Sequence, residues 1–411
     1  MDANWGLRSI EAATEQGRRA VDLAVEVGAD FIDQAGEWDR AAAFPTVHIE
    51  RLQASGLTAA TCSVDSGGGG VSRVLDQMAI VNRLARADSS VGIASNMHLS
   101  FLRSASRLVA RGVAPAGLID LIGRTVAGET WVTAAVSEAG TNYFHPRARL
   151  RVDGSGWVLN GEKIFATGSP AATDLTANVV VGGGDLDGRL ATIVLPVDHP
   201  GIEVVDDWDG MGMRGSGSGR VLFHDAALGA DTVVLPGGPA GSFSPDALVA
   251  RAVGNVGNLA AIHGVAENAR RLVVERVTGE QRVSDRALSE RPTVRQSLGQ
   301  LETDLLTAVA VLRDIGGRAD EMVVAGAVDM ISAQRFMAEF QAAKLVANAK
   351  AIAVVDRGLE LAGGAGYTGS HPLSRLYRDV RAGPFMQPFT PHEGLGWTGA
   401  VVSGRQPDIE A

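Results

Sequence analysis

The sequence predicts an α+β protein in three parts: an N-terminal helical domain, a middle antiparallel β domain and a C-terminal four-helix bundle. Three observations predict this order. Apolar residues recur at helical spacing in 1–126, short strands separated by turn residues fill 127–238, and long helical stretches occupy 239–411. Strands do not alternate regularly with helices, so a doubly wound sheet of the Rossmann type is not expected.

Composition and charge limit the function before any motif is considered. With 411 residues, 45% of them hydrophobic and 20% charged, the chain is expected to be globular with more than one packed region. A net charge of −10 argues against a nucleic-acid partner, because binding a phosphate backbone needs a basic face. The single cysteine, Cys62, excludes an intrachain disulfide, and the eight histidines show no metal-ligand spacing, so we expect no metal.

Targeting signals are also absent from the pattern. No stretch reaches the roughly 18–20 consecutive apolar residues that a membrane helix requires. The first residues, Met1 to Trp5, lack the basic and then apolar run of a signal peptide. We therefore expect a cytoplasmic protein with no membrane partner.

The N-terminal domain is predicted from helical periodicity. Ala20, Ala24 and Val27 recur at three- and four-residue spacing, and the pattern continues to about Ile122. A run of glycines at 67–70 interrupts it and predicts a surface loop.

The middle domain is predicted from short strands and the turns between them. The strands are expected at 131–136, 148–152, 157–159, 179–181, 191–195 and 221–223. Asp153-Gly154 and Asn160-Gly161 lie between strands, and Asn-Gly is the pair that a type I′ hairpin turn favours.

The C-terminal domain begins with a cap. Ser244 followed by Pro245 is typical of a helix N-cap with proline at the first helical position. Long helices are predicted near 246–277, 292–316 and 329–361, and a shorter one begins near Pro391.

Four segments contain motifs, and each has a plain structural interpretation when taken alone. They are 136–142 (Val-Ser-Glu-Ala-Gly-Thr-Asn), 157–168 (Trp-Val-Leu-Asn-Gly-Glu-Lys-Ile-Phe-Ala-Thr-Gly), 207–218 with Gly-Met-Arg, and 361–379 with Gly-Gly-Ala-Gly-Tyr and Arg-Asp. A strand end, a hairpin, a loop and a helix end would explain them one by one. The glycines of the last segment also match a dinucleotide-binding fingerprint, but they follow a helix and not a strand, so we reject that interpretation.

Together and in this order, the four segments resemble the acyl-CoA dehydrogenase superfamily of flavoproteins over nearly the whole chain. The resemblance implies a flavin between the sheet domain and the C-terminal helices, with FAD expected and FMN as the alternative. It also implies a homotetramer, because the family's flavin site borrows residues from a neighbouring subunit. It assigns cofactor contacts to Ser137, Thr141, Phe165, Thr167, Arg276, Gly363, Gly364 and Gly366.

The resemblance gives these residues different roles. Phe165 would pack on the flavin ring, and the hydroxyl of Thr167 would reach its N5 edge. Gly363, Gly364 and Gly366 would let the backbone approach the dinucleotide tail, because a side chain there would block it. Arg276 would bind phosphate, although an arginine near a helix end also stabilises that end without any ligand.

The chemistry is less determined than the cofactor. A dehydrogenase of this family needs a carboxylate that removes a proton next to the thioester carbonyl. The usual position, soon after Arg378-Asp379, holds none, and Glu393 comes several residues later. Glu393 is the candidate base if the protein is an FAD-dependent acyl-CoA dehydrogenase. Alternatively it is a first-turn residue of the helix that begins at Pro391.

The monooxygenase branch of the same fold, which includes dibenzothiophene monooxygenase and isobutylamine N-hydroxylase, needs no such base. Its members receive reduced flavin from a separate reductase and use O2. The segment 206–219 is similar to that branch, and His98, His392 and Thr167 are candidate catalytic residues. We therefore favour a two-component monooxygenase acting on a small organic substrate, with a flavin reductase as partner. A non-catalytic scaffold subunit with the flavin fold is the third alternative.

Overall fold

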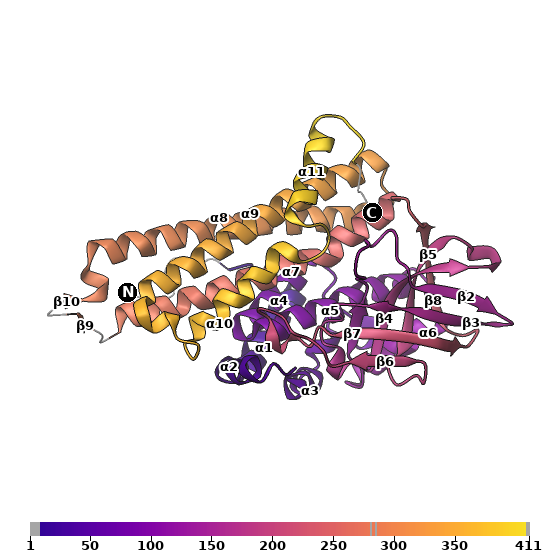
Figure 1. Cartoon of the computed structure of the whole chain (residues 1–411), viewed down its shortest axis with the longest axis horizontal. Helices are drawn as coiled ribbons and strands as arrows, with labels where there is room; N and C mark the ends of the chain where they lie inside the picture. The colour runs from indigo at the N-terminus through magenta and orange to yellow at the C-terminus, as the bar shows by residue number, and fades with distance from the viewer. Residues whose placement is uncertain (1–8, 280–281, 284–285, 408–411) are drawn as a thin grey trace.

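The computed structural model describes residues 9–279, 282–283 and 286–407. Figure 1 shows a sheet domain at one end, a long helical bundle that extends away from it, and the N-terminal helices beneath the junction of the two. The change from helices to strands falls between α6 and β1, and the change back falls between β8 and α7.

The N-terminal part is helical, as predicted. Its helices are α1 (Glu15–Gly28), α2 (Phe31–Ala41), α3 (Thr46–Ala54), α4 (Val74–Ala87), α5 (Ser89–Ala110) and α6 (Ala116–Val126), with 3-10 turns at Leu57–Ala59 and Val64–Ser66. Side chains fix where two of them begin, because Thr14 accepts from the N–H of Gly17 and Asp88 accepts from those of Ser90 and Val91.

The middle part is a single eight-stranded sheet with the order β6-β7-β3-β2-β4-β5-β8, in which β1 also pairs with β4. The strands are β1 (Val132–Ala135), β2 (Arg149–Asp153), β3 (Gly156–Lys163), β4 (Asp174–Gly182), β5 (Arg189–Pro196), β6 (Ile202–Val205), β7 (Arg220–Leu228) and β8 (Val233–Pro239). Short 3-10 turns connect them at Ser169–Ala171, Gly184–Leu186 and Arg214–Ser216. Most neighbours are antiparallel, as predicted, but β1 and β2 both run parallel to β4.

Two strands and one turn differ from the prediction. The strands β6 and β8 were not expected, and both strands lie at edges of the sheet. In β8 the two prolines and two glycines hide the strand pattern, and proline is tolerated in an edge strand. Asn160-Gly161 forms no hairpin turn and lies inside β3 at a bulge. There the Asn160 side chain bonds to Asp225, and a Cβ on Gly161 would stand 2.6 Å from that of Ala148. The turn before β3 is instead at Asp153-Gly154, where Gly154 has φ +58°.

The C-terminal part consists of long helices. They are α7 (Pro245–Thr278), α8 (Pro292–Ala325), α9 (Met330–Ala362), α10 (Pro372–Asp379) and α11 (Pro391–Val402), with 3-10 turns at Leu288–Glu290, Gly363–Tyr367 (η7) and Val380–Phe385 (η8) and the short strands β9 (Arg282–Val283) and β10 (Arg286–Ala287). Ser244 caps α7 by accepting from the N–H of Ala247, as its position before Pro245 predicts. The helix α10 was not predicted.

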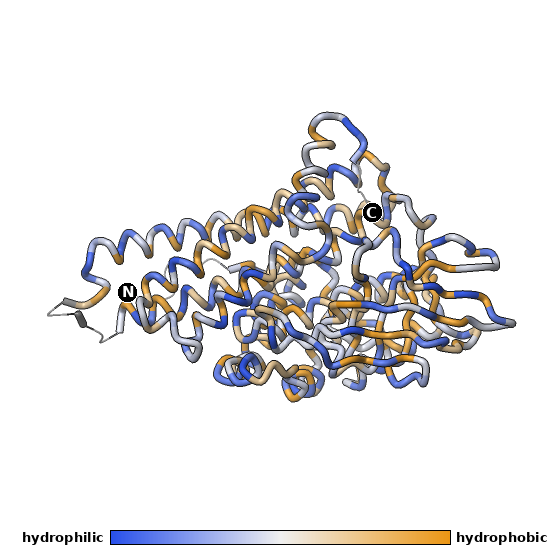
Figure 2. Tube along the Cα trace, viewed as in Figure 1, coloured by the Kyte–Doolittle hydropathy of each residue, from blue (hydrophilic) through white to orange (hydrophobic). Residues whose placement is uncertain are grey.

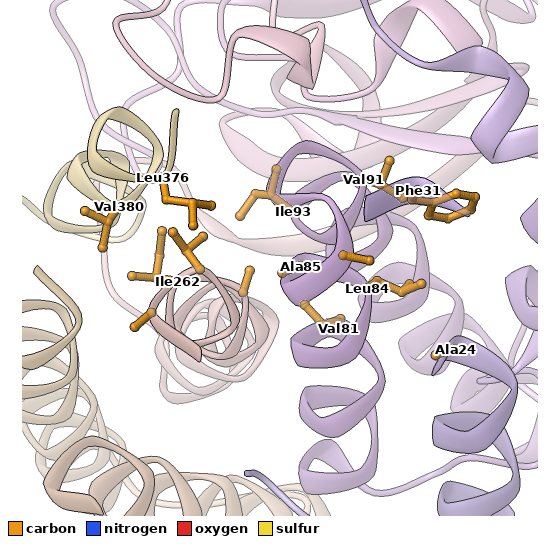
Figure 3. Close-up of a cluster of buried hydrophobic side chains, with 14 of the residues drawn as sticks. Ala24, Phe31, Val81, Leu84, Ala85, Val91, Ile93, Ile262, Leu376 and Val380 are labelled. Carbon is orange, nitrogen blue, oxygen red and sulfur yellow. The ribbon is translucent and has the colours of Figure 1, made fainter. Parts of the chain in front are cut away.

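The N-terminal and C-terminal helices share one core. Figure 3 shows Val81 and Leu84 of α4 in the same buried cluster as Ile262 of α7 and Leu376 of α10. Along the bundle helices hydrophobic and hydrophilic residues alternate (Figure 2), although nearly every residue of α7 between Ala252 and Arg270 is buried. Among the described residues, no helix is both long enough and apolar enough to cross a membrane.

Candidate functional site

Phe165 is held in an unusual position at the edge of the sheet domain. Its φ is +57°, a left-handed conformation that is rare for an aromatic residue and costs free energy unless the surroundings hold it. The flanking backbone fixes it, because the N–H of Ile164 donates to Ser137 (2.8 Å) and that of Ala166 donates to Gly219 (3.0 Å). Phe165 is 56% exposed, and its ring makes a T-shaped contact with Trp208 at a centroid distance of 5.9 Å. An exposed flat ring fixed in this way offers a surface for another flat molecule.

Thr167 lies two residues further on and begins a chain of hydroxyl groups. Its Oγ1 is 2.9 Å from Oγ of Ser218, which is 2.7 Å from Oγ of Ser216. Ser216 and Ser218 are buried, whereas Thr167 is partly exposed. Thr167 is therefore the outer end of the chain and can exchange a hydrogen bond with a ligand at the surface.

Ser137 connects the sheet to the C-terminal segment. Nε2 of Gln387 reaches Oγ of Ser137 at 3.4 Å, and Oε1 of Gln387 accepts from Arg251 at 3.0 Å. The guanidinium of Arg251 lies over the ring of Tyr143, 4.3 Å from its centre. Three distant parts of the chain thus meet beside Ser137. No motif in the sequence indicated Gln387, and only the presence of a charge in the apolar start of α7 distinguished Arg251.

The backbone that carries Gln387 is held by a buried lysine. Nζ of Lys344 on α9 donates to the carbonyls of Met386, Pro388 (3.4 Å) and Phe389 (2.6 Å), and its residue is 2% exposed. Burial lowers the pKa of Lys344 to about 8, opposed by the charge of Glu393. Next to it, between α9 and the segment 384–391, lies a cavity of about 200 Å³. Asn348 lines this cavity, and its buried side-chain amide has no hydrogen-bond partner among the described residues.

The hydroxyl of Thr141 is used inside its own loop. Its Oγ1 donates to the carbonyl of His145, which closes a turn after Ser137. Thr141 lies on the same loop as Ser137, but its hydroxyl proton is already engaged.

His98 is a core residue. It is fully buried and stacks on Trp131 at 4.7 Å, and burial lowers its pKa to about 4. Its Nδ1 accepts from the N–H of Val132 (3.0 Å), so Nε2 carries the proton and donates to the carbonyl of Thr58 (3.0 Å). Both ring nitrogens are occupied, which leaves none to contact a ligand.

Glu393 and His392 lie in the exposed first turn of α11. The carboxylate of Glu393 accepts from the N–H and the hydroxyl of Thr390 at 2.6 and 2.7 Å, which makes a capping box. His392 is exposed beside it. The structure therefore favours the helix-end interpretation of Glu393 over the role of a base.

The remaining predicted cofactor residues lie at the other end of the bundle. Arg276 is in the last turn of α7, and Gly363, Gly364 and Gly366 form η7 after α9. At about 1.5 Å per residue, Arg251 and Arg276 are about 37 Å apart along α7. One chain therefore brings Ser137, Phe165 and Thr167 together but does not bring the glycine turn or Arg276 to them.

The sheet side of this site fits a flavin. The exposed ring of Phe165 matches the flat ring system, and the hydroxyls of Ser137 and Thr167 match its polar edge. Among the described residues, no group of three or more His, Cys, Asp or Glu side chains could hold a metal ion.

Comparison with known proteins gives matches over the whole chain. The models of the N-terminal, middle and C-terminal domains of acyl-CoA dehydrogenases match residues 14–108, 133–226 and 257–387. L-evernosamine nitrososynthase from Micromonospora sp. is 34% identical, with 99% of this chain and 95% of that protein covered.

Solved structures agree. The X-ray structure of a KijD3 in complex with FMN and dTDP-3-amino-2,3,6-trideoxy-4-keto-3-methyl-D-glucose has a TM-score of 0.89 and 31% identity, covering 98% of this chain and 97% of that one. FMN-bound TdsC, a dibenzothiophene monooxygenase from Paenibacillus sp. A11-2, has a TM-score of 0.84 over 96% of this chain and 99% of its own. At 23% identity, the second likeness concerns the fold alone.

Proposed function

Because the chain belongs to the acyl-CoA dehydrogenase family, we propose that it is a flavin-dependent oxygenase that oxidises the amine nitrogen of a nucleotide-linked amino sugar. The relatives support this choice. One of them is named a nitrososynthase and is similar over the full length. A structure at 31% identity is described with FMN and a dTDP-linked amino sugar.

One observation in the structure carries the choice of an oxygenase over a dehydrogenase. The groups that the C-terminal segment and α7 bring to Ser137 are the neutral amide of Gln387 and the cation of Arg251. Neither can accept a proton from carbon. Glu393, the carboxylate that a dehydrogenase would use, is engaged by Thr390 in the cap of α11. An oxygenase needs no carboxylate at this place.

In this proposal the residues of the chain bind and orient. Phe165 supports the flavin ring, and Ser137 and Thr167 offer hydrogen bonds to its polar edge. Reduced flavin supplies the electrons with which O2 delivers one oxygen atom to the amine nitrogen and releases the other as water. Two such rounds, followed by loss of one more water, convert R–NH2 to R–N=O.

The partners follow from the same proposal. A separate flavin reductase supplies the reduced flavin. FAD remains the expected cofactor and FMN the alternative, with FMN supported by the 31% identical structure that is described with it. The chain assembles as a homotetramer, in which Arg276 and the glycines of η7 reach the flavin of a neighbouring copy.

The test is a reaction with defined components. The purified protein is mixed with a TDP-linked amino sugar, O2, NADH, a flavin reductase and either flavin, and the product is analysed by mass spectrometry with ¹⁸O2. We expect a hydroxylamine or nitroso sugar that contains ¹⁸O. A parallel anaerobic mixture of the flavin-loaded protein with acyl-CoA should leave the flavin oxidised. Flavin bleaching there would overturn the proposal in favour of the dehydrogenase, and failure to bind FAD or FMN would favour the scaffold.

A further inference from the structure

The guanidinium of Arg251 is a cation without a matching anion. Among the described residues it forms no ion pair with a carboxylate; it donates to the neutral oxygen of Gln387 at 3.0 Å and lies over the face of Tyr143 at 4.3 Å. Its Nε is buried and has no hydrogen-bond partner. Burial lowers the pKa of Arg251, which means that the charged form is held at a cost.

The surroundings increase that cost. Lys163, a fully buried cation, pairs with Glu138 at 2.6 Å, so Glu138 is not free to neutralise Arg251. The charge of Arg251 even lowers the pKa of Lys163. A second donor without a partner, Nδ2 of Asn142, belongs to the residue next to Tyr143. This corner therefore offers positive charge and free N–H groups and lacks an anion to receive them.

Arginine is suited to one class of ligand in such a place. Its planar fork of N–H groups binds phosphate through two parallel hydrogen bonds, and it keeps its charge when partly buried. Gln387 is exposed, so the corner opens to solvent beside Ser137. The chain as a whole carries a net charge of −10, so an anionic ligand would be repelled unless a local cation received it.

We propose that Arg251 is the anion-binding residue of the site and binds a phosphate group of the ligand. The assignment of that phosphate to the nucleotide diphosphate of the substrate rests on the proposed function. The phosphate of a flavin nucleotide is the other source of the same chemistry, and the two are separated by the experiment.

The experiment measures binding and not turnover. Flavin-free protein, wild type and the variants Arg251→Gln and Arg251→Lys, is titrated calorimetrically with TDP, thymidine, FMN and riboflavin. The control is Arg271→Gln, on the same helix, because Arg271 already pairs with Glu275 at 2.8 Å. Thermal melts confirm that each variant is folded.

We expect Arg251→Gln to weaken TDP binding by about tenfold or more, because a charge-assisted hydrogen bond is lost, and Arg251→Lys to restore part of it. Thymidine and riboflavin should be unaffected, and the control should match the wild type. If Arg251→Gln binds FMN no more tightly than riboflavin while its affinity for TDP is unchanged, the phosphate that Arg251 binds is that of the flavin. If neither anion is affected, Arg251 only holds Gln387 and the proposal is overturned.

The outcome is independent of catalysis. Loss of TDP binding in Arg251→Gln, combined with a wild-type protein that oxidises no amino sugar, would leave the anion site standing and reject the proposed function. If the wild type oxidises an amino sugar and Arg251→Gln binds the anions as the wild type does, the proposed function stands and the anion site at Arg251 is rejected.

Discussion

A carboxylate that caps a helix cannot remove a substrate proton without leaving the cap. Glu393 accepts two hydrogen bonds from Thr390, and a proton-abstracting role would require breaking both. At the scale of the residue, this is where the two enzyme classes can be separated.

Replacing Glu393 tests this directly. Glu393→Gln should leave oxygenase turnover unchanged, and because glutamine also serves in a capping box, the free energy of unfolding should change by about 0.5 kcal/mol or less. Glu393→Ala should cost about 1 kcal/mol in stability, again without loss of turnover. Steady-state kinetics and urea unfolding measure both. Loss of turnover in a folded Glu393→Gln protein would restore Glu393 as the base.

His98 predicts how the protein responds to acid. Burial lowers the pKa of His98 from 6.5 to about 4, so His98 is protonated at a lower pH in the folded state than in the unfolded chain. The stability from neutral His98 is complete above pH 6.5 and is lost as the pH falls toward 4, by about 3 kcal/mol. His98→Gln should be less stable at pH 7 but should lose less on going to pH 4.5.

Urea unfolding at the two pH values checks this, with His224→Gln as control because His224 is exposed. An unchanged pH dependence in His98→Gln would show that another group governs acid unfolding.

At the scale of the element, α5 and α7 cross around a buried amide. Asn96 of α5 accepts from Gln77 at 2.9 Å and donates to Asn258 of α7 at 2.7 Å. The space for it exists because residue 257 is glycine: a Cβ there would stand 1.9 Å from Oδ1 of Asn96. At Gly254, one turn earlier, a Cβ would meet Ser100 only at 3.6 Å.

These two glycines make a matched pair. Gly257→Ala should displace Asn96 and lower the free energy of unfolding by about 2 kcal/mol or more. Gly254→Ala fits and should raise it by up to about 1 kcal/mol, because alanine favours the helix. Thermal and urea unfolding compare them, and equal effects of the two substitutions would contradict this account of the crossing.

How far the sequence predicts an element depends on how local its cause is. The long helices α7 and α9 were predicted almost to the residue, because periodicity and the Ser244-Pro245 cap lie within the segment itself. The strand β8 was missed because its prolines and glycines indicate a turn, and only its place at the sheet edge makes a strand feasible. Asn160-Gly161 was misinterpreted because Asp225, which binds it, is far along the chain.

The site shows the same limit at the scale of the whole molecule. Family motifs led to Phe165 and Thr167, but the meeting of Ser137, Gln387 and Arg251 depends on how three parts of the chain pack. His98 was a candidate beside a core interpretation, because the sequence does not reveal that Thr58 and the N–H of Val132 occupy its nitrogens.

The separation of the two groups of predicted cofactor residues leads to a prediction about assembly. Gly364 is exposed, and among the described residues, its two chain neighbours aside, no atom lies within 4 Å of a Cβ placed there. Gly364→Leu should therefore fold normally yet bind flavin more weakly, because its side chain would obstruct a neighbouring copy. Phe165→Gly should also weaken flavin binding, through loss of the ring surface.

Mixing the two variants tests whether one site uses two chains. Mixed assemblies contain sites with both contributions intact, so flavin binding and turnover should partly recover after unfolding and refolding the variants together. Light scattering should give the mass of a tetramer. No recovery from two individually impaired variants would place both contributions in one chain.

Lys344 has a consequence for how such an enzyme changes over evolution. It holds the backbone of 386–389 by its carbonyl groups, which every amino acid has, so this part of the hold does not depend on which side chains the segment carries. Mutation can therefore exchange the group presented beside Ser137 while the scaffold persists. The residue beside Ser137 can therefore change during evolution while the fold stays the same. This makes Gln387 a position at which the chemistry could be redesigned.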